Sequence, residues 1–157
     1  MRARATLLPL LACLVSLGAP RPAGAQARGP IAVILNPSNP ENGLATEDLR
    51  HLYLGVRTAF PNRAPVLLVA LPALRERFYA AALGMGDAQF RRYWMGLVFS
   101  GDSALPPVEV GTEDAVKQLV ARHRGAVGFI DAAAADPSVK VVTIDGLRPD
   151  DPQYPLR

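Results

Sequence analysis

Histidine, cysteine and paired carboxylates are the residues of this chain that could do chemistry. Its two histidines, His51 and His123, fit no metal-ligand spacing and stand beside no nucleophile motif. Cys13 is the single cysteine, so residues 14–157 contain no thiol and cannot form a disulfide. Paired carboxylates occur only in predicted first turns of helices, at 47–48 and 113–114, where they offset the helix dipole. We therefore predict a protein that is not an enzyme and holds no metal ion or cofactor.

Helix starts offer a second kind of chemistry, because their free backbone N–H groups bind anions without a charged side chain. The sequence predicts helix starts near Thr46, Pro72 and Thr112. Polar loops lie at Ser38–Asn39 and at Ser100–Gly101. Hydroxyls and amides at such positions can hold a small oxyanion. The candidate ligand-binding residues from this argument are Ser38, Asn39, Ser100, Gly101 and Thr112.

The first 25 residues have the features of a signal peptide. Residues 1–4 are positively charged, residues 5–18 form an apolar run, and Ala23-Gly24-Ala25 is a small-residue cleavage pattern. The run is shorter than the ~20 residues that a membrane-spanning helix needs, and no later stretch comes close. We predict export to the periplasm with cleavage near Ala25, and no integral membrane segment. Acylation of Cys13 is the alternative, since residues 10–13 loosely resemble a lipobox, although that cysteine lies in the middle of the run.

The charge of the predicted mature chain, residues 26–157, is balanced. Three arginines belong to the leader, which has no acidic residue, so 14 basic and 14 acidic side chains remain. A long-range basic field is therefore absent, and nucleic acid is not an expected partner.

Strands alternate with helices along residues 26–146. Residues 31–35 are apolar throughout, which indicates a strand that is buried on both faces. The pattern predicts an α/β domain with a largely parallel or mixed sheet. Residues 147–157 contain three prolines and two aspartates and are expected to form a poorly ordered tail. The predicted strands are 31–35, 66–70, 108–110, 127–130 and 139–144, and the predicted helices are 46–55, 72–83, 87–98 and 112–124.

Five segments, in order, resemble the phosphate-binding component of ABC phosphate transporters, and more closely its short single-lobe relatives. These segments are AVILNPSNP, LATEDLRHLYLGVRTAFPN, RERF, YWMGLVFSG and GAVGFID, within residues 30–146. The resemblance implies one lobe of a type II periplasmic binding protein-like fold, with a central mixed sheet flanked by helices. It also implies a non-catalytic protein that binds a phosphate-like oxyanion and works with a transporter.

The chain departs from that family where phosphate is held. Family members carry an arginine and then a Gly-Ser-Gly-Thr-Arg-Glu-like turn, whose hydroxyls and amides grip phosphate at a helix start. Aligned on Arg75-Glu76, the Gly-Ser-Gly-Thr stretch falls on Leu71-Pro72-Ala73-Leu74, and the preceding arginine falls among residues 67–70. Only Arg75 remains as a candidate ligand residue from this motif. The charge-assisted hydrogen bonds that phosphate needs are therefore mostly lost.

Two functions are compatible with this sequence. The first is an exported binding protein for a small oxyanion, held by backbone amides and by hydroxyls such as Ser38, Ser100 and Thr112. Since one lobe forms only one wall of a cleft, tight binding would need a homodimer or a partner protein. The second is an interaction module that has lost the phosphate site and docks on an envelope protein or transporter. The altered residues 71–74 favour the second function.

Overall fold

The computed structural model describes residues 29–61 and 63–157, so the predicted signal peptide and Cys13 lie outside the described residues. Its helices are α1 (Thr46–Tyr53), α2 (Arg75–Leu83), α3 (Asp87–Phe99) and α4 (Glu113–Arg122), with a short 3-10 helix at Ala132–Ala134. Its strands are β1 (Ile31–Leu35), β2 (Gly43–Leu44), β3 (Leu67–Ala70), β4 (Val108–Glu109), β5 (Ala126–Asp131), β6 (Lys140–Val141) and β7 (Thr143–Ile144). In this part of the chain, no helix combines the length and the apolar content needed to cross a bilayer.

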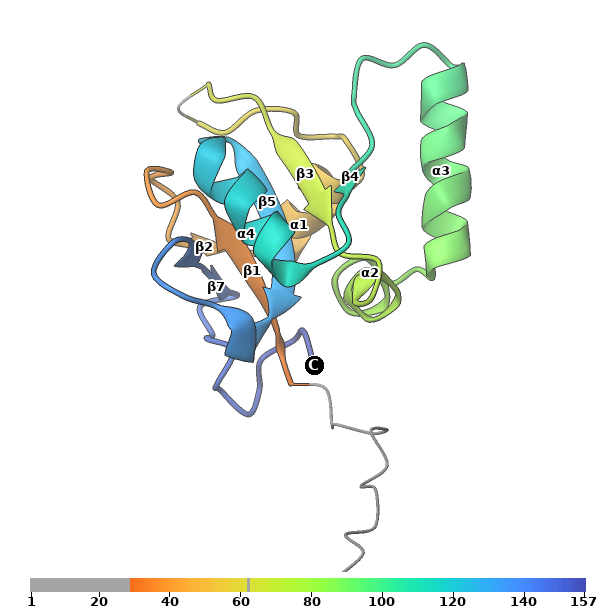
Figure 1. The fold of residues 1–157 in the computed structure, drawn as a ribbon. Helices are drawn as coiled ribbons and strands as arrows, with labels where there is room; N and C mark the ends of the chain where they lie inside the picture. Colours follow the sequence, from red (N-terminus) through yellow and green to blue (C-terminus); the bar gives the residue numbers. More distant parts are fainter. Residues whose placement is uncertain (1–28, 62) are drawn as a thin grey trace, which may run out of the picture.

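A five-stranded sheet in the order β4-β3-β5-β1-β6 forms the centre of the molecule (Figure 1). Strand β1 is antiparallel to β5 and β6, whereas β3 is parallel to β4 and β5. The predicted α/β fold with a central mixed sheet flanked by helices is confirmed. We call the side on which β3, β4 and β5 end the carboxyl edge. The opposite side, where β3 and β5 begin and β1 ends, is the amino edge.

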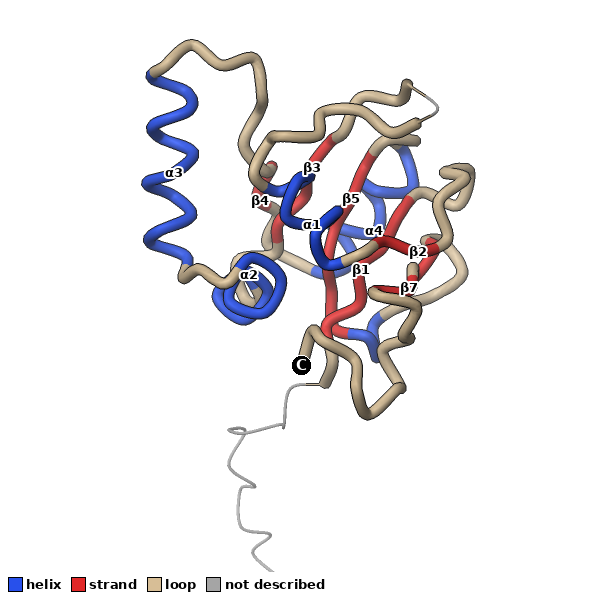
Figure 2. The backbone as a smooth tube through the Cα atoms, turned by 180° about the vertical axis from the view of Figure 1, so that it is seen from behind, coloured by secondary structure: helices blue, strands red, loops and turns tan. Residues whose placement is uncertain are grey.

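Helices cover both faces of the sheet, and β5 shows how the two faces differ. Figures 1 and 2, which are opposite views, place α4 on one face and α1 on the other. Side chains alternate along a strand, so neighbouring residues of β5 face different helices. Gly128 faces α4 so closely that an added Cβ would lie 2.8 Å from Val116. Phe129 faces α1 and α2, where it meets Tyr53 and Phe78.

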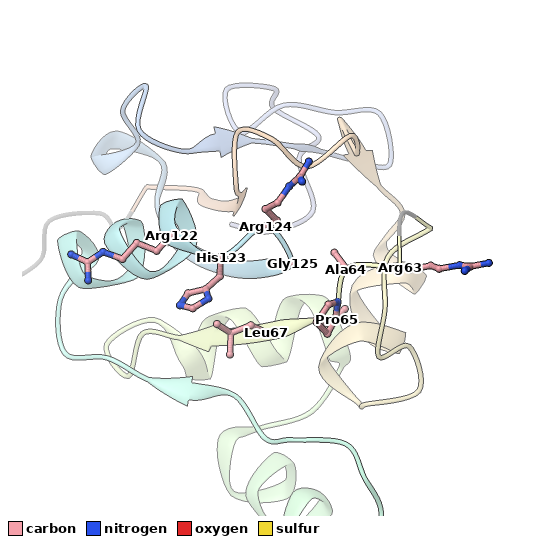
Figure 3. A pocket seen from close by; sticks show the side chains of 9 residues that line it. Arg63, Ala64, Pro65, Leu67, Arg122, His123, Arg124 and Gly125 are labelled. Atoms are coloured by element: carbon pink, nitrogen blue, oxygen red, sulfur yellow. The ribbon is translucent and has the colours of Figure 1, made fainter.

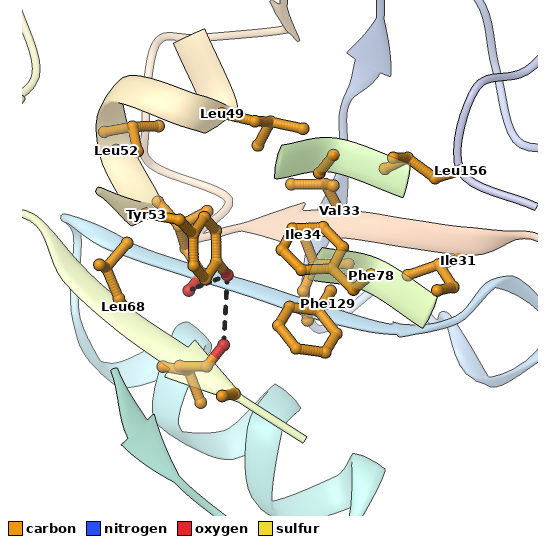
Figure 4. Packing of buried hydrophobic residues seen from close by; sticks show 14 of the residues in the cluster. Ile31, Val33, Ile34, Leu49, Leu52, Tyr53, Leu68, Phe78, Phe129 and Leu156 are labelled. Carbon is orange, nitrogen blue, oxygen red and sulfur yellow. Dashed lines mark hydrogen bonds between the residues drawn. The ribbon is translucent and has the colours of Figure 1, made fainter. Parts of the chain in front are cut away.

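An aromatic cluster forms the core between the sheet and the helices α1 and α2 (Figure 4). The rings of Phe78 and Phe129 are stacked with their centroids 4.0 Å apart, and Tyr53 meets Phe78 edge-on at 4.9 Å. The hydroxyl of Tyr53 donates to the carbonyl oxygen of Val69 at 3.3 Å. That bond satisfies the one polar atom of the ring inside the core.

Helix α3 stands at the side of the molecule and packs on the rest through only part of its surface (Figure 1). Phe90 and Trp94 are buried, and the indole N–H of Trp94 donates to the carbonyl oxygen of Tyr53 at 3.1 Å. Val98 lies within the predicted helix 87–98, but its side chain is 53% exposed. Phe99 beside it is 83% exposed. The helix therefore carries more apolar surface than its contacts within the chain cover.

Helix α1 begins differently from the prediction. The sequence predicted Thr46 as the N-cap, whereas Ala45 takes that position and its N–H donates to the carboxylate of Asp48 at 3.0 Å. Thr46 is bonded through its N–H and hydroxyl to Asp145. The hydroxyl is thus used to tie the helix to the turn after β7 rather than to cap it.

The predicted strand over residues 139–144 is divided between two sheets. Strand β6 pairs with β1, whereas β7 pairs in parallel with β2. Between them, the N–H of Val142 donates to the carbonyl oxygen of Val33 at 3.1 Å. The sequence did not predict β2, because two residues are too few to show a period.

The segment 147–157 is a correction to the prediction of a poorly ordered tail. Tyr154 and Leu156 are buried, with exposed fractions of 3% and 0%. The hydroxyl of Tyr154 donates to the carbonyl oxygen of Ile31 at 3.0 Å. The N–H of Ile31 donates to the carbonyl oxygen of Leu156 at 2.8 Å. Two apolar side chains among the prolines therefore anchor the segment beside the start of β1.

Three buried tyrosines predict how the fold responds to alkali. Burial raises the pKa of Tyr53, Tyr79 and Tyr154 well above the usual value of about 10. A tyrosine whose pKa is higher in the folded than in the unfolded protein stabilises the fold. This contribution is fully present below the unfolded-state pKa and is lost as the pH rises from there through the folded-state pKa. We expect phenolate absorbance from these residues to appear only when circular dichroism shows unfolding, with single Tyr→Phe variants assigning the signal. Phenolate from any of the three in a protein with native circular dichroism would contradict this.

Candidate functional site

The carboxyl edge at residues 71–75 is the place where the family resemblance puts phosphate. The sequence predicted a helix from Pro72, but α2 begins only at Arg75. The N–H groups of Leu74 and Arg75 donate to the carbonyl oxygen of Leu71 at 3.0 and 3.1 Å. Leu71 and Leu74 are buried, with exposed fractions of 3% and 6%. Two amides at the helix start are therefore already bonded within the chain, and residues 71–75 themselves contain no hydroxyl side chain.

The guanidinium of Arg75 is held by two carboxylates. Its Nε lies 3.0 Å from Asp87 Oδ1, and its Nη1 lies 2.6 Å from Glu109 Oε1. The other oxygen of Asp87 lies 2.7 Å from Arg91. An oxyanion at Arg75 would have to displace a carboxylate that is already paired there.

The carboxylates that pair with Arg75 also act on the nearby phenol of Tyr79. Burial, and then the carboxylates of Asp87 and Glu109, raise the pKa of the Tyr79 phenol, whereas Arg75 lowers it. The two carboxylates thus favour the protonated, neutral form of this phenol. The predicted ligand residue Arg75 is better explained as part of an ion-pair network than as an anion receptor.

Thr112, also on the carboxyl edge, caps α4 as predicted from the sequence. Its Oγ1 accepts a hydrogen bond from the N–H of Ala115 at 3.2 Å. The next residue, Glu113, accepts from the N–H of Asp131 at 2.9 Å. Two carboxylates, Glu113 and Asp114, therefore follow the cap directly, which disfavours an oxyanion at this helix start.

Ser38 and Asn39 lie at the amino edge, because β1 runs antiparallel to β5. The N–H of Ser38 donates to the side chain of Asn36 at 2.8 Å, and the Ser38 side chain is exposed. Asn39 is only 2% exposed, and its amide donates to the carbonyl oxygen of Arg124 at 3.2 Å. Asn39 thus fixes the loop after β1 against the end of α4.

Ser100 and Gly101 lie at a third place, the far end of α3. The hydroxyl of Ser100 donates to the carbonyl oxygen of Leu97 at 2.8 Å, and Gly101 has a positive φ of 76° that turns the chain. The six predicted residues therefore do not meet in one site. Arg75 and Thr112 share the carboxyl edge, Ser38 and Asn39 share the amino edge, and Ser100 and Gly101 stand apart from both.

A basic cavity that was not predicted from the sequence lies at the amino edge (Figure 3). We give this name to the cavity of about 760 Å³ between residues 63–67 and 122–125. Arg63, Arg122, His123 and Arg124 lie around it. One signal was available, because neither segment 49–75 nor segment 115–130 contains an aspartate or a glutamate.

An apolar groove lies beside α3. It is a space of about 360 Å³ between α3 and residues 106–109, which include β4 and the two prolines before it. Met95, Val98 and Phe99 line it and are 54%, 53% and 83% exposed. Scattered exposed apolar residues are normal in soluble proteins, but three such neighbours around a groove are typical of a contact surface.

Neither histidine lies in a catalytic arrangement. His51 Nε2 is 3.2 Å from Glu47 on the exposed side of α1, and His123 stands beside the basic cavity. Among residues 29–61 and 63–157, no three His, Cys, Asp or Glu side chains are grouped so that they could hold a metal ion.

No protein-family model and no curated protein matches this chain. Solved structures do resemble it. One is a protein described as a phosphate ABC transporter substrate-binding protein from Clostridium perfringens, with bound phosphate (TM-score 0.62, 21% identity, 76% of this chain and 46% of that chain). Another is an ABC-type phosphate transport receptor from Vibrio cholerae (TM-score 0.61, 21% identity, 76% and 48%). A third is PstS from Borrelia burgdorferi (TM-score 0.60, 10% identity, 81% and 53%).

These similarities confirm, at the level of the fold, the predicted resemblance to phosphate ABC transporter substrate-binding proteins. The chain spans about half the length of the structures it matches. The central mixed sheet flanked by helices therefore corresponds in extent to about half of such a protein, as expected for one lobe.

Proposed function

We propose that this chain is an exported, non-catalytic binding protein whose ligand is a small oxyanion of the phosphate type. The observation that carries the proposal is the fold, because the solved structures that share it include phosphate transport proteins, one of them with bound phosphate. A binding protein needs no catalytic group, and the sequence offers no nucleophile motif. Residues 26–146 would form the binding domain, and residues 1–25 would direct the chain to the periplasm.

The binding domain on its own presents one wall to a ligand. Small-molecule sites usually enclose ~70–90% of the ligand surface. A second copy of the chain, a transporter or another envelope protein would supply the opposite wall. At the carboxyl edge the wall is lined by paired carboxylates, so we do not expect the ligand to bind there.

A second candidate function, an interaction module without an oxyanion ligand, is favoured by the apolar groove. Met95, Val98 and Phe99 would be covered by an envelope protein or transporter partner instead of water. Burial of apolar surface contributes about 25 cal/mol per Å², which makes such a contact favourable. Under this function, the protein would show no specific response to phosphate.

Thermal unfolding of the purified protein tests the proposed function. A micromolar site gains about 4 kcal/mol at a thousandfold excess of ligand. For a protein of this size, that free energy raises Tm on the order of 10 °C. We expect such a rise with orthophosphate or tripolyphosphate, and none with sulfate or chloride at equal ionic strength. Equal curves in all four salts would reject the oxyanion ligand and favour the interaction module.

A further inference from the structure

The basic cavity has walls that the fold holds in place. One wall, residues 63–67, leads into β3, and the other, residues 122–125, joins α4 to β5. The N–H of Leu67 donates to the carbonyl oxygen of Gly125 at 2.9 Å, and the two strands continue the parallel pairing. The walls approach so closely that a Cβ on Gly125 would lie 1.9 Å from the carbonyl oxygen of Pro65. The shape of the cavity is therefore fixed by the pairing of β3 with β5 and by the close contact of its two walls.

The charge around the cavity is positive and uncompensated. Arg63, Arg122 and Arg124 are exposed, and none of them makes an ion pair with a carboxylate of the described residues. By contrast, Arg57 and Arg75 elsewhere in the fold are each paired with two carboxylates. A local group of unpaired cations attracts anions even when the net charge of the chain is balanced.

The end of α4 would normally weaken such a site, because the last carbonyls of a helix carry partial negative charge. The side chain of Asn36 covers two of them. Its amide donates to the carbonyl oxygens of Val120 and Ala121 at 3.0 and 2.8 Å. Asn39 donates to the carbonyl oxygen of Arg124, which follows the helix, at 3.2 Å. These bonds leave the cavity with less negative potential from its own helix.

The side chains are spread around the cavity rather than gathered on one point. In Figure 3, the ring of His123 lies over Leu67, whereas the guanidinium groups of Arg63, Arg122 and Arg124 point outward in different directions. Guanidinium groups that point in different directions do not converge on one small anion such as orthophosphate. An anion with several phosphate groups offers separate acceptors to more than one of them.

We propose that the basic cavity is the anion site of this chain and that its ligand class is an anion with several phosphate groups. The ligand could be a soluble polyphosphate or the phosphate headgroups of a lipid surface, since both offer the same chemistry. The proposal rests on the proposed oxyanion-binding function and adds the place and the ligand class. It places the anion at the amino edge, opposite the edge that the family resemblance indicates.

Calorimetric titration of the purified protein tests this proposal. At fixed ionic strength, we expect affinity to fall in the order tripolyphosphate, pyrophosphate, orthophosphate, with sulfate weakest. Arg122→Gln and Arg124→Gln should each raise the Kd for tripolyphosphate about tenfold, the loss expected for one charge-assisted hydrogen bond. Arg92→Gln is the matched control, because Arg92 is an exposed arginine of α3 far from the cavity walls. It should leave the Kd within about twofold of the wild-type value.

Vesicle flotation separates the two sources of phosphate groups. Binding to vesicles that contain phosphatidylglycerol, but not to neutral phosphatidylcholine vesicles, would identify lipid headgroups, and Arg122→Gln should reduce it. Binding of soluble tripolyphosphate without flotation would identify a free ligand. Either result supports the basic cavity, provided that the two cavity variants weaken it.

Two results would contradict the proposal, and they are distinguishable. If wild-type protein binds tripolyphosphate and the cavity variants bind it equally well, the site is elsewhere and only the inference fails. Loss of binding in Arg75→Gln would then locate the site at the carboxyl edge. If wild-type protein binds none of these anions or vesicles, the oxyanion-binding function fails together with the inference.

Discussion

Gly125→Ala is expected to destabilise the protein by about 3 kcal/mol and to lower Tm by roughly 10 °C. The Cβ of alanine would stand 1.9 Å from the carbonyl oxygen of Pro65, and real Cβ atoms do not approach backbone so closely. Because the obstructing atom is backbone, no side-chain rotation relieves the clash. The turn before β3 would have to move away from β5, which breaks the hydrogen bond from Leu67 to residue 125.

Gly96→Ala is the matched control for this change. Gly96 lies within α3, and an added Cβ would meet nothing within 4 Å. Alanine there should stabilise the helix by up to about 1 kcal/mol. Calorimetric melting of both variants checks the comparison. A Gly125→Ala protein as stable as the wild type would show that the two walls of the basic cavity are not in the close contact described above.

Phe129→Ala should cost about 4 kcal/mol, the largest effect expected of any single change considered. Phe129 is fully buried, stacks on Phe78 and also contacts Tyr53 and Tyr79. Removing the ring leaves a cavity between β5 and the helices α1 and α2. These two helices also contact each other through the aromatic cluster, by way of Tyr53 and Phe78. Small domains have about 5–15 kcal/mol of stability in total, so most of the margin would be lost.

Urea denaturation measures this loss, with Phe99→Ala as the matched control. The same substitution at the 83% exposed Phe99 should change stability by less than about 0.5 kcal/mol. A loss below about 1 kcal/mol for Phe129→Ala would mean that the aromatic cluster is not the tightly packed core that the ring distances indicate.

Much of the fold could be predicted from hydrophobic patterning. The uninterrupted apolar run at residues 31–35 predicted a strand buried on both faces, and each of its residues is fully buried. The helical spacing of Phe90 and Trp94 predicted a helix over residues 87–98, and α3 spans Asp87–Phe99. Packing of Tyr154 and Leu156 could not be predicted, because two apolar residues among prolines have no period. Their burial depends on the start of β1, which is far away in the sequence.

The candidate site was less predictable than the fold, because residue type does not give strand direction. Hydroxyls and helix starts at Ser38 and Thr112 suggested one oxyanion site, but the antiparallel β1 places them at opposite edges of the sheet. The basic cavity joins residues 63–67 to residues 122–125, and only the pairing of β3 with β5 brings them together. The absence of acidic residues from both segments was visible in the sequence, whereas their contact was not.

The backbone hydrogen bond between Ile31 and Leu156 has a consequence for how the molecule can be attached to a surface or to another domain. Since β1 starts at the carboxyl edge, the first and last described residues of the chain lie at the same edge. A covalent link at either of these residues, to a sensor surface or to a fused domain, would therefore attach the molecule at its carboxyl edge. The amino edge, with its arginines, would face outward in both orientations. Attachment chemistry at either end thus leaves the basic cavity accessible.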